Sequence, residues 1–415
     1  LISYVHSYFL TSSLLLFVLV IKNILYPKLN EIRISERDNN MKEIGILNIS
    51  DIHLGHNKNH TEDIANNLLT MILENIRLIK KYVKLLLLTG DEFDRLLTMM
   101  SNDSRIIISF FMKLAAICKE NNIIIRCIEG TNSHSYGQMK IIETAIKKSN
   151  LNVDFVYFNN LAIEYIPSLD LNVLYIPDEL NGNDSSKTIK QVRELLKAKN
   201  LEQVDIALMH GAFNYQLPFK LESNHIEKDY LEIVKHYIFI GHVHKHSVYK
   251  KIIAAGSPDR LVHGQEEDKG IVFALINKLN PKENSYKFIV NKYAKTFLTI
   301  KVENEDFQEL IKTASRTIKN LRPDSHVRFV VDENNKVIKN NIIDLKKMFP
   351  KINFTEDKIE KETISIFNHK MTKSKDIKTF SITQDNIIQL INDKIKDKVT
   401  GEDLKILNKE LNDLI

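Results

Sequence analysis

Five polar segments of the chain combine histidine and aspartate side chains in a way that suits metal chemistry. They read DIHLG from Asp51, GDEFD from Gly90, GTNSHS from Gly130, MHG from Met209 and GHVH from Gly241. Carboxylates and neutral imidazoles together bind divalent transition ions, and a shared carboxylate can bridge two such ions. Two ions about 4 Å apart can activate a bridging water and stabilise the attacking and leaving oxygens of a phosphate. The pattern therefore favours hydrolysis of a phosphoester.

Each of these segments follows a short apolar run that predicts a β-strand. From Met41 to about residue 278, such runs alternate with longer amphipathic stretches, which indicates alternating strands and helices. The strands are continuously apolar, so we expect helices to cover a central sheet in an α/β fold. The carboxyl ends of strands in an open α/β sheet share one crevice, where the five segments can converge. Fewer helices separate the later runs, which predicts a mixed sheet or two sheets packed together.

The order of the five segments resembles the calcineurin-like metallophosphoesterases over residues 44–244. This resemblance implies a four-layer α/β/β/α sandwich and two divalent metal ions, Mn²⁺ in the first place and Mg²⁺ as the alternative. The metal ligands that it implies are Asp51, His53 and His244 for one ion, His210 and His242 for the other, and Asp91 as the bridge. It gives His134 a catalytic role, either protonating the leaving alkoxide or positioning the phosphate.

The loop that contains Asn132 departs from the family pattern. The family has Gly-Asn-His followed by an acid, with the asparagine on the second metal. Here Ser133 separates Asn132 from His134, and Ser135 stands in place of the acid. Asn132 can still reach the ion through a loop adjustment, or Ser133 or a water can substitute for it. The departure leaves open a reduced activity or an altered metal preference.

Residues 255–270 narrow the resemblance to one branch of the family. The strings AGSPDR and HGQEEDKG resemble the segment after GHxH in the nuclease subunits of SbcCD-type double-strand-break repair complexes, including SbcD-like and phage recombination endonucleases. The resemblance implies exonuclease action on duplex DNA ends and endonuclease action on hairpins or single strands. It also implies an SMC-like coiled-coil ATPase partner and a homodimer. Arg260 is a candidate substrate-binding residue for a phosphate, with a structural ion pair as the equal alternative.

Two other functional classes compete with the nuclease interpretation. A calcineurin-like phosphodiesterase acting on a small molecule or a lipid headgroup would use the same metal site without needing helices at the C-terminal end. A non-catalytic scaffold is suggested only by the altered loop at Asn132. The complete set of histidines and aspartates argues against a scaffold, because burying so many polar side chains without a ligand is costly.

The chain divides into five predicted parts. Residues 1–40 form a doubtful extension that we do not expect in the fold, and residues 41–280 form the nuclease domain. Residues 281–366 predict a small α+β capping domain, and residues 367–380 predict a polar linker. Residues 381–415 contain two amphipathic helical patterns, which can fold back onto the body or dock in the groove of the ATPase partner.

The apolar run at residues 10–21 has three interpretations: a signal peptide, a membrane anchor, or sequence upstream of a functional start at Met41. We favour the last, because a strand pattern begins directly after Met41, so we expect no membrane partner unless residues 1–40 are genuine. The two cysteines, Cys118 and Cys127, form no CxxC pattern, which favours a reducing compartment. We expect the cytoplasm of a bacterial or phage-infected cell, or association with the nucleoid.

Composition adds little about the partner. The net charge of +5 over 415 residues permits an anionic partner such as DNA without requiring one. Tryptophan is absent, and no interleaving of aromatic and basic residues marks a platform for stacking bases. The expectation of DNA as substrate therefore depends on the resemblance.

Overall fold

The computed structural model describes residues 43–98, 101–218, 221, 223–302, 306–332 and 335–358. The doubtful extension, the linker and the two tail helices of the sequence prediction lie outside these residues. Within the described ranges, no helix has both the length and the apolar character needed to cross a bilayer.

Two six-stranded sheets form the main body of the described fold, which is mixed α/β. The first sheet has the order β12-β11-β1-β2-β3-β4, and the second has the order β5-β6-β7-β8-β10-β9. The strands of the first sheet are β1 (Glu43–Ile49), β2 (Val83–Leu88), β3 (Ile124–Ile128), β4 (Phe155–Phe158), β11 (Gly270–Asn277) and β12 (Ser285–Val290). Those of the second are β5 (Ala162–Ile166), β6 (Leu171–Ile176), β7 (Val204–His210), β8 (Val234–Gly241), β9 (Ser247–Tyr249) and β10 (Ile252–Ala254).

The strands at the centre of each sheet run parallel. In the first sheet, β1 to β4 are parallel, and β11 joins β1 antiparallel, followed by β12. In the second, β6, β7, β8 and β10 are parallel, while β5 and β9 are antiparallel edge strands. The parallel cores bring the ends of β1, β2 and β3 to one edge of the first sheet, and the ends of β6, β7 and β8 to one edge of the second.

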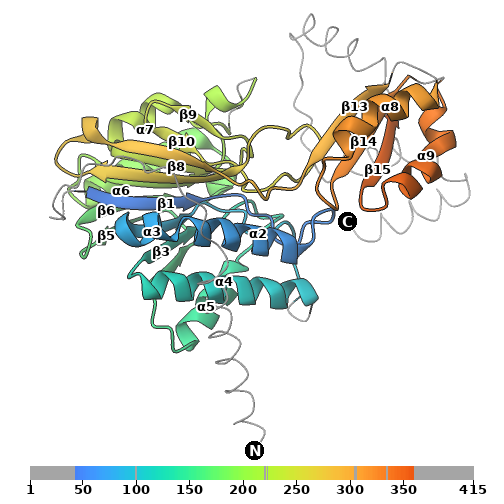
Figure 1. Cartoon of the computed structure of the whole chain (residues 1–415). Coiled ribbons are helices and arrows are strands. Elements are labelled where there is room, and N and C mark those ends of the chain that lie inside the picture. Colours follow the sequence, from blue (N-terminus) through green and yellow to red (C-terminus); the bar gives the residue numbers. More distant parts are fainter. Residues whose placement is uncertain are drawn as a thin grey trace, which may run out of the picture. The chain divides into compact units, whose positions relative to one another are not determined.

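Helices accompany both sheets. In the part of the chain that the structure describes, they are α2 (Thr61–Glu74), α3 (Ile76–Tyr82), α4 (Asn102–Glu120), α5 (Met139–Lys148), α6 (Ser185–Ala198) and α7 (Glu227–Ile233). Helices α2, α4 and α5 lie together on one side of the first sheet (Figure 1) and share one hydrophobic cluster with it. Helices α6 and α7 share a different cluster with the second sheet. Short 3₁₀ turns occur at Leu180–Gly182, Asn214–Gln216 and Pro281–Glu283.

Strand β2 shows why the strand sequences are continuously apolar and do not alternate between apolar and polar residues. Its Leu86 and Leu88 pack with the helices of the first sheet, whereas Leu85 and Leu87 pack in a second cluster between the two sheets. Successive side chains of a strand point to opposite faces, so both faces of β2 are buried. Strand β7 behaves in the same way: Leu208 lies in the cluster between the sheets and Met209 in the cluster with α6 and α7.

A buried arginine links the two sheets. Arg126 lies on β3 of the first sheet, and its guanidinium makes two hydrogen bonds of 2.8 Å to the carboxylate of Glu164 on β5 of the second sheet. Asp154 accepts a further bond of 2.9 Å from the same guanidinium. Fork-shaped pairing of this kind fixes geometry as well as charge.

The described residues from Thr296 onward belong to a second compact unit. It contains β13 (Phe297–Val302), α8 (Phe307–Ile318), β14 (His326–Val331), α9 (Val337–Met348) and β15 (Asn353–Lys358). The three strands are all parallel, so the unit is a βαβαβ arrangement with its own core, where the sequence predicted an α+β domain. The predicted boundary at residue 280 falls before β12, whereas the units divide after Lys295, because β12 pairs with β11.

Candidate metal centre

The ends of the parallel strands bring most of the predicted site residues together. Asp51 and His53 follow β1, Asp91 follows β2, and His210 ends β7. The GHVH segment begins with Gly241, the last residue of β8. Backbone bonds continue past the strand ends: the amide of Asp51 donates to the carbonyl of Gly90 at 3.0 Å, and that of His53 to the carbonyl of Asp91 at 3.0 Å. The predicted convergence of these segments is confirmed.

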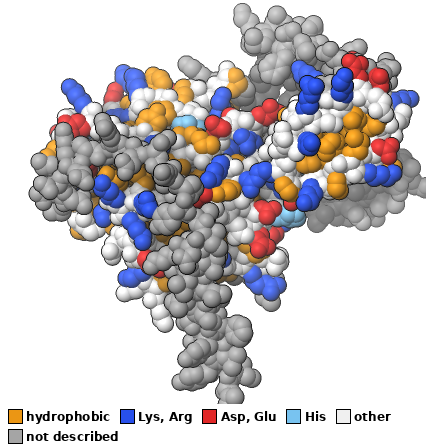
Figure 2. All heavy atoms as spheres, viewed as in Figure 1, with side chains coloured by type: hydrophobic (Ala, Val, Ile, Leu, Met, Phe, Trp, Pro, Cys, Tyr) orange, Lys and Arg blue, Asp and Glu red, His pale blue; other side chains and the backbone are white. Residues whose placement is uncertain are grey.

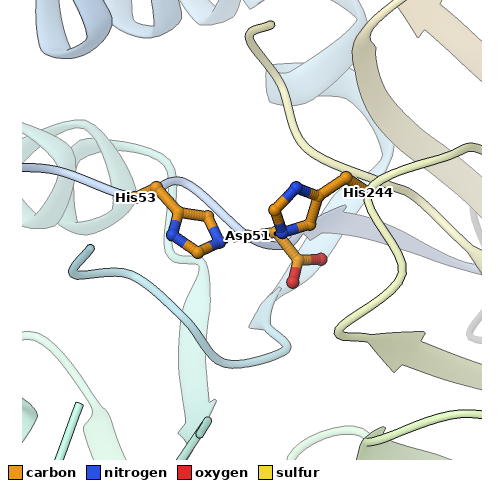
Figure 3. A group of neighbouring side chains, drawn as sticks. All are labelled: Asp51, His53 and His244. Atoms are coloured by element: carbon orange, nitrogen blue, oxygen red, sulfur yellow. Dashed lines mark hydrogen bonds between the residues drawn. The ribbon is translucent and has the colours of Figure 1, made fainter. Parts of the chain in front are cut away.

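The first cluster contains Asp51, His53 and His244, whose ligand atoms lie within 4.8 Å of one another. Figure 3 shows the imidazole rings of the two histidines turned toward each other, with Asp51 beside them. Their Nε2 atoms are 3.0 Å apart. Nδ1 of His53 faces the carboxylate of Asp94 at 3.1 Å, and a carboxylate accepts, so this nitrogen carries the proton. The Nε2 lone pair of His53 is thereby directed into the cluster.

The second cluster contains Asp91, His210 and His242, again within 4.8 Å. Nδ1 of His210 donates to the carbonyl of Thr89 at 2.7 Å, which leaves Nε2 as an acceptor in the neutral ring. That Nε2 lies 3.2 Å from Oδ2 of Asp91 and has no hydrogen-bond partner among the described residues. Two acceptors therefore face each other in a buried place, which requires a cation or an added proton between them.

The pKa shifts of the second cluster also indicate a place for positive charge. Burial lowers the pKa of His210, but the carboxylates of Asp91, Asp178 and Asp51 together raise that pKa well above its ordinary value. Burial would raise the pKa of Asp91, yet contact with His210 and the nearby His53 hold it well below its ordinary value. The site thus stabilises a negative carboxylate beside a positive charge, which a divalent ion can supply as well as a proton.

The donor set fits two divalent transition ions. Each cluster offers a carboxylate and two imidazoles, which are ligands that Mn²⁺, Fe²⁺ and Zn²⁺ accept. In both clusters a second partner orients a histidine: Asp94 holds His53, and the carbonyl of Thr89 holds His210. Partners of this kind fix the tautomer and aim the ligating nitrogen.

His134 lies beside the first cluster. Its ring centroid is 5.0 Å from that of His53, in an edge-to-face arrangement. Its Nδ1 donates to the backbone carbonyl of Asp94, so Nε2 is the nitrogen left to exchange a proton. The structure therefore places His134 beside the first cluster, and its catalytic role stays a prediction.

Asn132 does not join the clusters. Its side chain is exposed, and its amide nitrogen donates to the carboxylate of Glu179. Thr131 takes the inner position instead: its amide donates to Oδ1 of Asp91 at 2.7 Å, and its hydroxyl lies 3.2 Å from Oδ2. The extra residue Ser133 is also exposed. The altered loop therefore presents a hydroxyl to Asp91 rather than the predicted amide.

Arg260 also lies apart from the clusters. Its guanidinium donates to the backbone carbonyls of Lys295 at 3.2 Å and Glu266 at 3.4 Å. These bonds hold the loop after the GHVH segment, which agrees with a structural role for Arg260, and its contact with a phosphate stays a prediction.

Four residues of the site were not assigned from the sequence. Asp94 orients His53, and Gln265 lies with its amide nitrogen 3.0 Å from Nδ1 of His244. The buried ammonium of Lys269 donates to the carbonyl of His244 at 2.8 Å. Asp178 follows β6 at the same edge of the second sheet. The strand-end pattern that identified the other residues applies equally to Asp178.

Four of the proposed metal-binding residues have unusual backbone angles. Asp51, His53, Asp91 and His242 have φ angles of 50°, 53°, 53° and 93°. Residues with side chains rarely adopt this left-handed region, and such strain concentrates at functional sites. Gly241 is required for close approach, because a Cβ there would lie 2.2 Å from the carbonyl oxygen of Thr89.

A pocket of about 170 Å³ lies beside the second cluster. Thr131, Asp178, His210 and His242 line it on the cluster side. Its other walls include apolar side chains, among them Ile176, Leu180, Ala212 and Leu217. The second cluster therefore faces an open space rather than packed protein.

Comparisons with known proteins place the chain in no family. No family model matches it, and no curated protein matches it. One crystal structure aligns with 12% identity over 60% of this chain and 99% of its own, with a TM-score of 0.36. The crystal structure of TT1561 of Thermus thermophilus aligns with 11% identity over 59% of this chain and 99% of its own, also with a TM-score of 0.36.

Proposed function

We propose that the chain is a metal-dependent phosphodiesterase with the four-layer α/β/β/α architecture of the calcineurin-like metallophosphoesterases. The observation that carries this proposal is the pair of clusters at the strand ends. In the second cluster, Nε2 of His210 faces a carboxylate oxygen of Asp91 at 3.2 Å, so a cation fits where two acceptors meet. In the first, the Nε2 atoms of His53 and His244 converge at 3.0 Å.

The side chains divide into three roles. Asp51, His53 and His244 would hold one ion, His210 and His242 would hold the other, and Asp91 would be the ligand shared by both. Bound Mn²⁺ or Mg²⁺ would supply an activated water and positive charge for the phosphate. His134 gives its proton from Nε2 to the leaving oxygen, while Asp94 keeps the rings of His53 and His134 in place through its carboxylate and its carbonyl.

We further propose DNA as the substrate, with exonuclease action on duplex ends and endonuclease action on hairpins or single strands. The support is the resemblance of residues 255–270 to SbcD-like and phage recombination nucleases. On the visible face, lysine and arginine side chains are interspersed with acidic and apolar ones (Figure 2), so the described part of that face carries no continuous basic stripe. We also propose the SMC-like ATPase, bound through residues 381–415, as the partner in this activity.

Nucleotide release from linear duplex DNA tests this function. The full chain is incubated with Mn²⁺, with the Asp91→Asn variant as the control. Release by the parent and not by the variant supports the proposal, because a neutral amide cannot bridge two ions as a carboxylate does. Equal release by both would contradict the two-metal chemistry.

A small generic phosphodiester serves as the second substrate. Cleavage of bis(p-nitrophenyl) phosphate without release from DNA, even with the ATPase partner added, would favour the small-molecule or lipid-headgroup phosphodiesterase. The two substrates therefore separate the metal chemistry from the choice of DNA.

A further inference from the structure

We propose that Asp178 is a metal-binding residue of the second cluster and takes the place that the sequence pattern assigned to Asn132. The inference rests on the proposed two-metal chemistry of the same site. It names a ligand that the five sequence segments do not contain.

The backbone places Asp178 at the second cluster. Asp178 follows β6, whose parallel neighbour β7 ends in His210, so the two residues leave the sheet at the same edge. Its amide donates to the carbonyl of Glu129 at 3.3 Å, which ties this loop to the segment after β3. Its side chain is 12% exposed and lines the pocket together with His210 and His242.

The side chain of Asp178 lies in one group with those of Thr131, Asp91 and His242. Its Oδ2 lies 3.0 Å from the hydroxyl oxygen of Thr131 and 3.8 Å from Nδ1 of His242. The same hydroxyl lies 3.2 Å from Oδ2 of Asp91 and 3.4 Å from Nδ1 of His242. The Thr131 hydroxyl thus stands among two carboxylates and an imidazole.

Counting protons shows why this group suits a cation. A hydroxyl has a single proton to donate, so Thr131 can satisfy one of the two carboxylates at a time. When that proton goes to Asp91, the carboxylate of Asp178 faces Nδ1 of His242 at 3.8 Å, which is too long for a hydrogen bond, and a largely buried carboxylate in this position is unfavourable without positive charge. A divalent ion near His210, His242 and Asp91 would remove this imbalance.

The neighbouring alternatives are already engaged. The Asn132 amide donates to Glu179 at the exposed surface, so these two residues satisfy each other. His225, which also lines the pocket, receives the hydroxyl of Tyr230 at its Nδ1, 3.0 Å away. Asp178 is therefore the side chain on the open side of the cluster that best supplies an oxygen donor. Exchanging a neutral amide for a carboxylate strengthens the attraction to hard divalent ions such as Mn²⁺ and Mg²⁺.

Metal binding itself tests this inference, without any assay of hydrolysis. The full chain, stripped with EDTA, is titrated with Mn²⁺ by calorimetry, and electron paramagnetic resonance reports whether two ions are close enough to couple. The variants are Asp178→Asn and Asp178→Ala. Asn132→Ala and Glu179→Gln are the matched controls, because both residues lie next to the site but bind each other.

We expect the parent to bind two equivalents with a coupled signal. Asp178→Ala should lose at least about 10- to 100-fold in affinity for the second equivalent, keep the first, and lose the coupling, whereas Asp178→Asn, which keeps a neutral oxygen donor, should lose less affinity than Asp178→Ala. Both controls should bind as the parent does. Circular dichroism melting shows whether each variant folds, and if Asp178→Ala does not, the smaller loss of affinity expected in Asp178→Asn relative to the parent decides the result.

Two results would overturn the inference. Two coupled equivalents with parental affinity in both Asp178 variants would show that Asp178 is not a ligand. Loss of the second equivalent in Asn132→Ala alone would return the role to the asparagine. A parent that binds fewer than two equivalents would instead contradict the proposed two-metal function itself.

Discussion

Nε2 of His210 lies 3.2 Å from Oδ2 of Asp91, while Nδ1 of the same ring donates to the carbonyl of Thr89 at 2.7 Å. The carbonyl fixes which nitrogen carries the proton, and the remaining nitrogen points at a carboxylate. Both side chains are buried, so the repulsion between these acceptors is not relieved by solvent. The pair is stable only with a positive charge, and this requirement leads to the first prediction.

Mn²⁺ should stabilise the folded chain. A ligand that binds only the folded state adds about 2.7 kcal/mol at 100 times its dissociation constant, so the melting temperature of EDTA-treated protein should rise on addition of Mn²⁺. The Asp91→Asn variant should show a clearly smaller rise, because one ligand is neutralised. Differential scanning calorimetry measures both, and equal rises would argue against metal binding at this pair.

His134→Ala should separate binding from catalysis. The residue lies beside the first cluster and is not needed to complete it, so Mn²⁺ and DNA affinities should stay near those of the parent. Loss of an acid should lower the rate of phosphodiester cleavage by about 10²- to 10⁴-fold. Single-turnover kinetics with a calorimetric metal titration check this, and a lost metal equivalent would identify His134 as a ligand instead.

Arg126→Met should destabilise the first unit strongly. The arginine side chain is 4% exposed and pairs with Glu164 across the two sheets, so its removal leaves a partly buried carboxylate unpaired. Breaking such a pair costs about 3 kcal/mol. The matched control is Arg193→Met, whose guanidinium is 51% exposed beside Asp229 and should change stability by less than about 1 kcal/mol.

Urea unfolding at pH 7 measures both arginine variants. The double variant Arg126→Met/Glu164→Gln should recover part of the loss, because the unpaired charge is then removed. A loss in Arg126→Met no larger than in Arg193→Met would show that the link between the sheets contributes little.

Stability should fall as the pH is lowered below neutrality, in part through His236. This side chain is fully buried on β8, and burial, followed by the charge of Lys235, lowers its pKa to about 4. Its Nδ1 accepts a hydrogen bond of 3.1 Å from the amide of Asn284, and its other nitrogen lies 4.0 Å from Asp205. The folded state thus binds this proton less readily than the unfolded state does.

Because the folded state binds this proton less readily, protonation of His236 favours the unfolded state. The contribution of His236 to stability is fully present above the unfolded pKa of about 6.5 and is lost as the pH falls toward 4. His236→Gln should flatten the dependence of unfolding free energy on pH in this range. His60→Gln, at an exposed histidine, serves as the control and should keep the parental slope. A parental slope in His236→Gln would refute the assignment.

The sequence predicted the strands and the convergence of their ends well, because both depend on local patterns. Apolar runs that end in His or Asp are visible without any tertiary information, and parallel strands bring such ends together. The sequence did not predict that Thr131, rather than Asn132, lies beside Asp91. This placement depends on how one extra residue, Ser133, changes the path of a loop, and that path is decided by contacts with Asp91 and Glu179.

Contacts between segments that are far apart in the sequence also explain other features that the sequence did not predict. Arg260 donates to the carbonyl of Lys295, and the strands β11 and β12 lie between these two residues in the sequence. No local pattern could reveal a bond between residues so far apart. The boundary after Lys295 depends on β12, whose side chains are mostly exposed and give only a weak apolar signal. Asp178 was missed although the strand-end rule covers it, since it stands alone without a nearby histidine or glycine.

The pairing of β1 with β11 has a consequence for synthesis on the ribosome. Glu43–Ile49 comes early, whereas its antiparallel neighbour Gly270–Asn277 comes after every proposed metal-binding side chain. A growing chain that has just passed His244 therefore contains all the ligands, yet β1 still has an open edge. Domains complete their folding only when such distant partners have emerged. The proposed metal centre should accordingly be completed late in translation, after its last ligand has been synthesised.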